Sequence, residues 1–265
     1  MIRKLLESPS EFLELTLRGK RVTVTRGELG ADSEVEEHEL ATVEEAQFFV
    51  ADAAREVERR GWVERAYEES YDDGPREPAL EAAITHAPEE PGGYLVYADW
   101  LQQRGEPRGE LIVVQHALAT GGRDAELRRR EAALLDEHPD RLRGPLALAG
   151  GARVDWWCGF VRALDLSYLL ASGLGRTLLA PLFAHASLRF LHRFAGSVGN
   201  DTDLAPLAER APPTLRWLEL DGDADRLRGF RRRLARLPPR LLGVEHLQVQ
   251  GRTYRSVAEW LADGP

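Results

Sequence analysis

The sequence predicts an α+β N-terminal domain, then a small helical module, then a C-terminal α/β solenoid with a short parallel sheet. Three observations support this fold class. Apolar residues alternate with polar ones near the N-terminus, proline-bounded helical segments occupy the middle, and a leucine phrase recurs at near-constant spacing in the last part. The expected domain bounds are 1–70, 71–155 and 156–265.

Composition indicates a cytoplasmic protein without a membrane segment. The 265 residues are 43% hydrophobic and 30% charged, which supplies enough apolar content for real cores. No run of roughly 18 apolar residues is present, as a transmembrane helix requires. The first residues also lack the continuous apolar stretch of a secretory signal. A single cysteine, Cys158, excludes an internal disulfide and fits a reducing compartment.

Charge is unevenly distributed along the chain. Residues 1–93 contain 23 acidic and 11 basic side chains, whereas the remainder contains 21 acidic and 24 basic ones. An acidic front part repels phosphate backbones, which argues against simple electrostatic binding of nucleic acid there. Apart from Lys4 and Lys20, every basic residue is arginine, a bias typical of GC-rich bacterial genomes.

The first 70 residues carry strand signals and then a helix. Apolar positions alternate on both sides of the turn Arg18-Gly19-Lys20, which predicts a β-hairpin. A helix is expected after Thr42, whose hydroxyl can cap it, with Glu45 three residues on as in a capping box. Gly61 is expected to end this helix, and a short extended piece follows at 62–63.

The hairpin, the glycine segment 26–30, the helix and the closing residues 61–64 (Gly-Trp-Val-Glu) resemble a WGR domain. That family is best known from poly-ADP-ribose polymerases, where it contacts DNA. The family's tryptophan and arginine fall at Arg26 and Glu28, while Gly27 and Gly30 are kept, so the features that suit DNA contact are altered. The resemblance leaves a nucleic-acid-associated module as the alternative function. Its expected contact surface is Arg18, Lys20, Arg21 and Arg26.

The middle of the chain is expected to be mostly helical. Residues 66–78 are rich in turn formers and predict a linker. Two helices follow, separated by the proline turn 88–91, and residues 105–110 break the chain again. A charged helix is then expected from Glu126 to Leu135, ended by His138-Pro139.

Three sequence segments resemble a small bacterial repeat-companion domain, which usually precedes leucine-rich-type repeats. The matching segments are 97–101 (Tyr-Ala-Asp-Trp-Leu), 104–110 (Arg-Gly-Glu-Pro-Arg-Gly-Glu) and 157–161 (Trp-Cys-Gly-Phe-Val). The resemblance covers about residues 79–166. It implies an architecture and no catalytic activity.

A phrase of the form L-x-x-L-x-L recurs from Val161 onward. It starts at Val161, Leu188, Leu215 and Val244, at spacings of 27, 27 and 29 residues. This spacing resembles leucine-rich repeats, in which each unit is a strand plus a helix and neighbours stack to bury their leucines. Arg193 stands where the second unit needs its third leucine, which predicts a local bulge or shift there. Helices are expected at 174–185, 203–210, 225–237 and 254–261.

Aligned strands would turn the residues between the leucines outward in columns on a concave face. The expected columns are Arg162, Arg189, Arg216 and Glu245; Ala163, Phe190, Trp217 and His246; and Asp165, His192, Glu219 and Gln248. An aromatic stripe flanked by arginines has the composition of a protein-binding hot spot, although irregular packing could instead bury Phe190 and Trp217. The predicted partner-binding residues are Arg162, Asp165, Arg189, Phe190, His192, Arg216, Trp217, Glu219 and His246.

A second candidate surface is the arginine-rich helix expected at 225–237. It is either an anion site, for nucleic acid or for the acidic N-terminal domain of another copy, or a solvated outer face. Its arginines are Arg226, Arg228, Arg231, Arg232, Arg233 and Arg236.

The residue patterns of enzymes and metal sites are missing from the sequence. The histidines are scattered with no H-x-x-x-H pair, and neither a G-x-S-x-G elbow nor a phosphate loop with Gly-Lys-Ser/Thr occurs. Cys158 is expected to be buried rather than nucleophilic. The sequence therefore predicts a non-enzymatic interaction module without cofactor or metal. It would act as adaptor, regulatory target or inhibitor of a bacterial enzyme by binding that protein on the concave repeat face.

Overall fold

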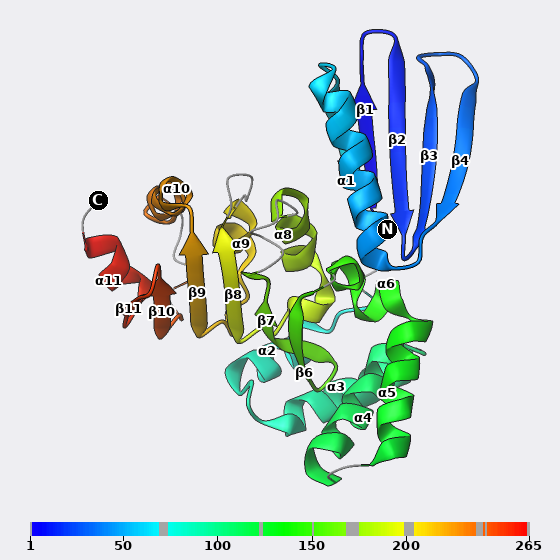
Figure 1. The fold of residues 1–265 in the computed structure, drawn as a ribbon. Helices are drawn as coiled ribbons and strands as arrows, with labels where there is room; N and C mark the ends of the chain where they lie inside the picture. The colour runs from blue at the N-terminus through cyan, green and yellow to red at the C-terminus, as the bar shows by residue number, and fades with distance from the viewer. Residues whose placement is uncertain are drawn as a thin grey trace. The chain divides into compact units, whose positions relative to one another are not determined.

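The computed structural model shows a mixed α/β protein with two β-sheets (Figure 1). The structure describes residues 2–68, 74–121, 124–149, 151–167, 175–198, 204–236, 241 and 243–263. Contacts divide the chain into two compact units, residues 1–72 with 144–150, and residues 73–143 with 151–265. Nearly all of the expected helical module and the whole expected solenoid, 71–155 and 156–265, therefore fall in one unit.

The first unit contains an antiparallel sheet of order β4-β3-β2-β1-β5. The expected hairpin is confirmed, because Gly19 adopts a φ of 57° at the first position of the two-residue turn between β2 and β3. The linker was expected at 66–78, but strand β5 continues to Glu68, so residues 66–68 are not part of a linker. Residues 69–73 lie outside the described part. The strands are β1 (Ile2–Glu7), β2 (Glu11–Arg18), β3 (Arg21–Glu28), β4 (Ser33–Glu39) and β5 (Val63–Glu68).

Helix α1 (Val43–Arg59) supplies the other half of this unit's core. The Thr42 side chain accepts a hydrogen bond from the Glu45 backbone N–H at 3.1 Å, and Gly61 follows the helix with a φ of 88°, so both expected ends are confirmed. Buried leucines and valines of β1, β2 and β3 pack against Ala46, Val50 and Ala54 of the helix. The remaining segment of this unit is the short helix η1 (Gly144–Leu148).

The second unit opens with helices that begin at proline. These are α2 (Pro78–His86), α3 (Pro91–Gln102), α4 (Pro107–Gly121) and α6 (Pro139–Leu142), with α5 (Ala125–Glu137) capped by Asp124. Proline suits the first helical turn because its missing N–H would have no partner there. The proline turn between the first two helices and the charged fifth helix are confirmed. The break expected at 105–110 is shorter, because Pro107 already opens α4.

The second sheet has the order β11-β10-β9-β8-β7-β6. Its four central strands β7 (Phe160–Asp165), β8 (Arg193–Val198), β9 (Trp217–Gly222) and β10 (His246–Val249) are parallel, so the expected short parallel sheet is present. Antiparallel strands β6 (Arg153–Trp157) and β11 (Arg252–Tyr254), which the sequence patterns did not reveal, form its two edges. Helices α8 (Gly175–Ala184), α9 (Ala205–Arg210) and α10 (Ala224–Leu234) connect the parallel strands, and α11 (Val257–Ala262) follows β11 (Figure 1).

The register of the second repeat differs from the expected one. Arg193 of β8 lies opposite Trp217 of β9, and buried Phe194 lies opposite Leu218, so this unit's phrase starts at Leu191 rather than Leu188. The reason is that the preceding short helix η2 (Ala186–Leu188) takes up three residues before the strand. The expected columns are therefore wrong in this unit: His192 replaces Arg189, Arg193 replaces Phe190, and Ala195 replaces His192.

Among the described residues, no helix is both long and apolar enough to cross a membrane.

Candidate functional site

The outward side chains of the parallel sheet form a stacked row, here called the cation–aromatic row: Arg193, Trp217 and His246. Strand pairing places them side by side on β8, β9 and β10. The rings of Trp217 and His246 stack with centroids 4.5 Å apart, and the Arg193 guanidinium carbon lies 5.1 Å from the Trp217 ring centroid. Trp217 is half-buried, while Arg193 and His246 are exposed. The row thus presents a flat, pre-formed π and cation surface to solvent.

Acidic residues beside the row balance most of its charge. Arg193 lies 3.4 Å from Glu219, two residues further along β9 than Trp217. Arg216 lies 3.6 Å from Glu245 and donates to the Pro213 carbonyl at 2.7 Å, which holds its side chain against the backbone. Paired charges of this kind give direction to recognition without making a strongly charged surface.

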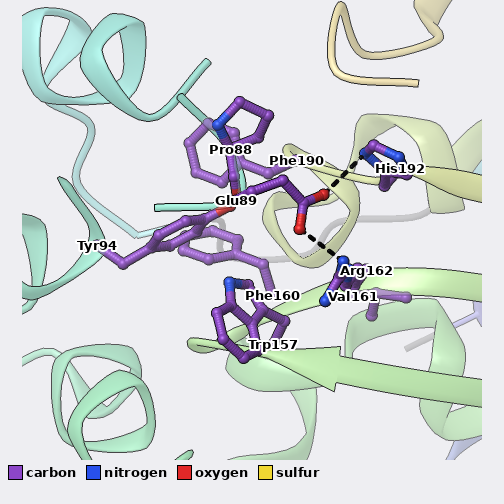
Figure 2. A pocket seen from close by; sticks show the side chains of 9 residues that line it. All are labelled: Pro88, Glu89, Tyr94, Trp157, Phe160, Val161, Arg162, Phe190 and His192. Atoms are coloured by element: carbon purple, nitrogen blue, oxygen red, sulfur yellow. Dashed lines mark hydrogen bonds and ion pairs between the residues drawn. The ribbon is translucent and has the colours of Figure 1, made fainter. Parts of the chain in front are cut away.

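Glu89, from the turn between α2 and α3, reaches the first two parallel strands (Figure 2). One carboxylate oxygen accepts a hydrogen bond from Arg162 at 2.6 Å, and the other lies 3.5 Å from Nδ1 of His192. Burial lowers the pKa of His192, and the charges of Arg162 and Arg216 lower it further, against the opposite effect of Glu89 and Glu245. Glu89 therefore lies against Arg162 of β7 and against His192, the residue just before β8.

A small enclosed space lies beneath Glu89. Its volume is about 10 Å³, room for roughly one water molecule. Tyr94, Trp157 and Phe190 are among the residues that line it, and no acceptor for the Trp157 indole N–H lies among the described residues. This space suits a bridging water between Trp157 and its polar neighbours, and it is too small for a ligand.

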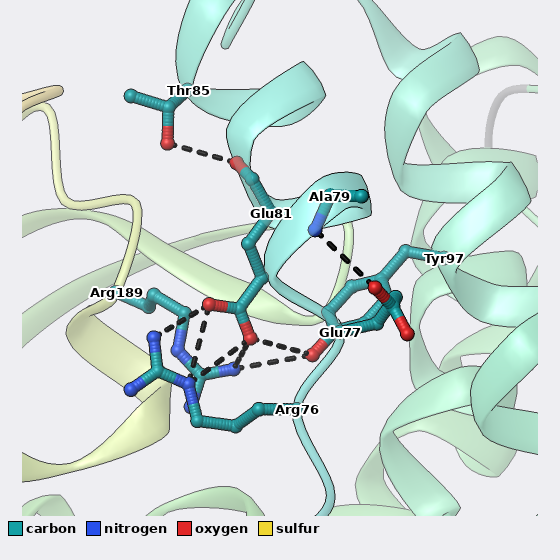
Figure 3. Close-up of polar contacts among 7 residues, drawn as sticks. All are labelled: Arg76, Glu77, Ala79, Glu81, Thr85, Tyr97 and Arg189. Atoms are coloured by element: carbon teal, nitrogen blue, oxygen red, sulfur yellow. Dashed lines mark hydrogen bonds and ion pairs between the residues drawn. The ribbon is translucent and has the colours of Figure 1, made fainter.

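Arg189 does not lie on the outward face as expected. It lies 2.8 Å from the buried carboxylate of Glu81, which also accepts hydrogen bonds from Arg76 at 2.6 Å and from the Tyr97 hydroxyl at 3.1 Å (Figure 3). Burial pushes the pKa of Glu81 upward, but the hydrogen bond from Arg76 and the charges of Arg189 and Arg76 outweigh it, and the net pKa is lowered. Arg189 is a structural tie between the helices and the sheet.

Phe190 is likewise absent from the face. Its ring lies 4.7 Å from that of Phe160 and 5.7 Å from that of Tyr94, inside the core shared by the helices and the first hairpin of the sheet. The alternative of burial by irregular packing is therefore correct for Phe190. The exposed residue at this place is Arg193, which the phrase Leu191-x-x-Phe194 could have revealed.

The carboxylate of Asp165, at the end of β7, already has partners on neighbouring residues. It accepts a hydrogen bond from the Ser167 backbone N–H at 2.9 Å and lies 3.9 Å from Arg153. Burial raises its pKa, but the hydrogen bonds of Ser167 and the charges of Arg153 and Arg193 lower it by more. Ala163 and Gln248 complete the outward positions of β7 and β10.

Two of the four basic residues expected to contact nucleic acid, Arg21 and Arg26, lie beside glutamates of β4. Arg26 lies 2.5 Å from Glu36 and 3.6 Å from Glu34. Arg21 lies 3.6 Å from Glu39 on the same edge strand. These carboxylates cancel the positive charge that a phosphate backbone would require, which weighs against nucleic-acid binding at this surface.

Neither a metal centre nor a reactive thiol emerges from the described residues. No three histidine, cysteine, aspartate or glutamate side chains within that part are grouped as ligands. Cys158 is buried at the turn between β6 and β7, and burial raises the pKa of its thiol to about 11. The thiol is therefore protonated at neutral pH.

Comparisons with known proteins give little to set beside this structure. No family model matches it, and no curated protein matches it. One solved structure, a structural-genomics target protein from Bacteroides fragilis, aligns over 92% of this chain and 80% of its own, at 15% identity and a TM-score of 0.27. A likeness this low carries no argument about fold or function.

Proposed function

We propose that this protein is a cytoplasmic, non-enzymatic interaction module that binds another protein on the outward face of its second sheet. The partner would be a bacterial enzyme for which this chain is an adaptor, regulatory target or inhibitor. The observation that carries the proposal is the cation–aromatic row of Arg193, Trp217 and His246. Tryptophan and arginine dominate binding hot spots because they bury large areas and keep a polar or charged end.

The same proposal assigns the second sheet to an irregular leucine-rich-type solenoid preceded by a repeat-companion module. Support comes from a backbone contact that recurs from strand to strand. In the second, third and fourth units, the residue just before the one in the row donates its backbone N–H to the carbonyl of the equivalent residue in the preceding unit, at 2.9 Å in every case. The donor–acceptor pairs are His192 to Arg162, Arg216 to His192 and Glu245 to Arg216. Such nearest-neighbour stacking is typical of repeat proteins.

Pre-organisation explains why the row suits a protein partner. Its three side chains already stack on one another, so binding would immobilise few further rotamers. The strands that carry them are fixed by buried leucines such as Leu218 and Leu247 behind the face. A rigid aromatic surface framed by Glu219, Arg216 and Glu245 fits a partner that inserts an apolar side chain between polar contacts.

The test combines capture with matched variants. Protein bound by the wild type from a bacterial lysate is identified by mass spectrometry, and its affinity is then measured with purified components. We expect Trp217→Ala to weaken binding at least about 30-fold, as loss of roughly 2 kcal/mol at a hot spot does. Arg193→Gln should weaken it less.

Arg128→Gln serves as the control, because Arg128 is exposed on helix α5 and is not part of the sheet. Circular dichroism verifies that each variant is folded. Unchanged affinity in Trp217→Ala and Arg193→Gln would eliminate this face as the binding surface. Retention of a DNA duplex by the wild type at low salt, lost in Arg26→Gln, would favour the nucleic-acid alternative instead.

A further inference from the structure

A cleft opens at the β11 edge of the second sheet, between α10, the β10–β11 hairpin and α11. Its volume is about 330 Å³, at the lower end of the range for small-molecule sites. This cleft lies beyond the cation–aromatic row, on residues that the proposed function does not use. Its polar and aromatic lining comprises Arg228, Arg231, Arg252, Tyr254, Trp260 and Asp263.

Positive charge exceeds negative charge in this cleft. Three guanidinium groups line it, whereas Asp263 is the single acidic side chain among the described lining residues. Asp263 accepts a hydrogen bond from the Tyr254 hydroxyl at 3.0 Å, which occupies one of its oxygens. This excess of positive charge belongs to the cleft alone, whereas the chain as a whole carries a net charge of −9.

The three arginines differ in how they are held. Arg231 donates to the Leu261 carbonyl at 2.9 Å, and its guanidinium carbon lies 5.7 Å from the Trp260 ring centroid, so its position is fixed. Arg228 pairs with Asp225, a residue of the same helix that does not line the cleft. Arg252 is exposed on β11, and no described carboxylate lies within ion-pair distance of it.

The floor of the cleft is apolar. Leu227 of α10, Val249 of β10 and Trp260 of α11 are all buried and line it. Arginines over an apolar floor match a ligand with oxyanion groups on a small organic body, because the planar guanidinium donates paired hydrogen bonds to carboxylate or phosphate oxygens. Lower water access over such a floor also strengthens each charge-assisted bond.

We infer that this cleft binds a small organic anion whose carboxylate or phosphate oxygens contact Arg228, Arg231 and Arg252. The binding is non-covalent and independent of the protein-binding face. Of the arginines on α10, only Arg228 and Arg231 belong to the site; Arg226 and Arg232 are exposed elsewhere on the helix.

The experiment titrates the full chain with citrate and, separately, with inorganic pyrophosphate at low salt by isothermal calorimetry. We expect saturable binding of one molecule, and the tighter of the two probes identifies carboxylate or phosphate as the preferred group. Arg252→Gln and Arg228→Gln should each weaken binding about tenfold or more, since each removes a charge-assisted hydrogen bond. Both side chains are exposed, so the variants should fold.

Arg226→Gln and Arg232→Gln are matched controls, with the same change of charge on the same helix outside the cleft. They should retain wild-type affinity. Absence of saturable binding of either probe at millimolar concentration would overturn the inference. Equal weakening by all four variants would also overturn it, because it would show a general polyanion surface rather than a site.

Discussion

The two edges of the second sheet have the same local turn in contrasting surroundings. Cys158-Gly159 joins β6 to β7 with φ values of 46° and 78°, and Gln250-Gly251 joins β10 to β11 with 51° and 74°. Two consecutive positive φ values are those of a type I′ hairpin turn, which suits the twist of antiparallel strands. The first turn is enclosed by helix α4, whereas nothing lies within 4 Å of a side chain placed at Gly251.

Buried polar side chains of α4 hold the first turn on both sides. Arg108 donates to the Gly159 carbonyl at 2.6 Å, and the Gln115 side-chain oxygen accepts from the Gly159 N–H at 2.7 Å. Arg108 also donates to the Arg141 carbonyl at 2.7 Å and lies 5.0 Å from the Phe160 ring centroid. One edge is thus built into a core, while the other remains open beside the cleft. Turn chemistry therefore sets the hairpin, and tertiary contacts decide whether its end is built into the core or left open.

The largest expected effect comes from removing the arginine that joins α4 to the enclosed turn. Arg108→Ala leaves the carbonyls of Gly159 and Arg141 buried without their donor, and we expect a loss of about 4 kcal/mol in unfolding free energy. Urea unfolding followed by circular dichroism measures it. Arg104→Ala is the control, because Arg104 lies on the exposed face of Trp100 and should cost below about 1 kcal/mol. A loss as small as that of the control would show that Arg108 does not hold the enclosed turn.

The two turn glycines provide the direct comparison of the edges. At Gly159 an added Cβ would lie 2.5 Å from the Ile112 side chain, and alanine would also have to keep the positive φ of the glycine. Gly159→Ala should therefore lower the free energy of unfolding by about 3 kcal/mol. Gly251→Ala meets open space and should cost only the backbone strain, about 1 kcal/mol. Both values come from the same denaturation experiment. Equal costs would mean that the clash at Gly159 is relieved by movement of Ile112.

A buried histidine should make the second unit acid-sensitive. Burial, helped by the charge of Arg108, lowers the pKa of His185 to about 3, whereas an unfolded histidine titrates near 6.5. Between these two pKa values the histidine is protonated in the unfolded state and neutral in the folded state. The free energy of unfolding is therefore highest at neutral pH and falls as pH drops from 6.5 toward 3. At pH 5 the expected loss is about 2 kcal/mol.

His185→Asn isolates this contribution. Asparagine can still accept the hydrogen bond that the Ser187 N–H donates to His185 Nδ1 at 3.2 Å, while it removes the titrating group. The difference in unfolding free energy between pH 7.5 and pH 5 should be smaller in the variant by about the same 2 kcal/mol. An unchanged difference would assign the acid sensitivity to other groups.

Local signals predicted the element ends well. Thr42 with Glu45, and Gly61, mark the ends of α1, and the proline turn 88–91 separates the first two helices of the second unit, as expected. Four strands escaped prediction for specific reasons. Strand β4 contains four glutamates, which strand propensity disfavours, and β1, β6 and β11 are short edge or near-edge segments stabilised by their neighbours.

The candidate site was predicted only in part. Trp217, Glu219 and His246 are outward-facing as expected, because the third and fourth units follow the phrase without interruption. The second unit offered two overlapping phrases, one starting at Leu188 and one at Leu191. Periodicity does not choose between them, since each has apolar residues at its first two positions and lacks a leucine at its third, where Arg193 or Gly196 stands.

By itself, the sequence determined most of the helices, the first hairpin and the presence of stacked parallel strands, because caps, prolines and leucine spacing act within a few residues. Only the tertiary structure decided which side chains of the second unit face solvent. Phe190 packs in the aromatic core around Phe160 and Tyr94, and Arg189 pairs with the buried carboxylate of Glu81. The contacts of that ring with Tyr94 and of that guanidinium with Glu81 join residues about a hundred positions apart in the chain, so no local sequence pattern could reveal them.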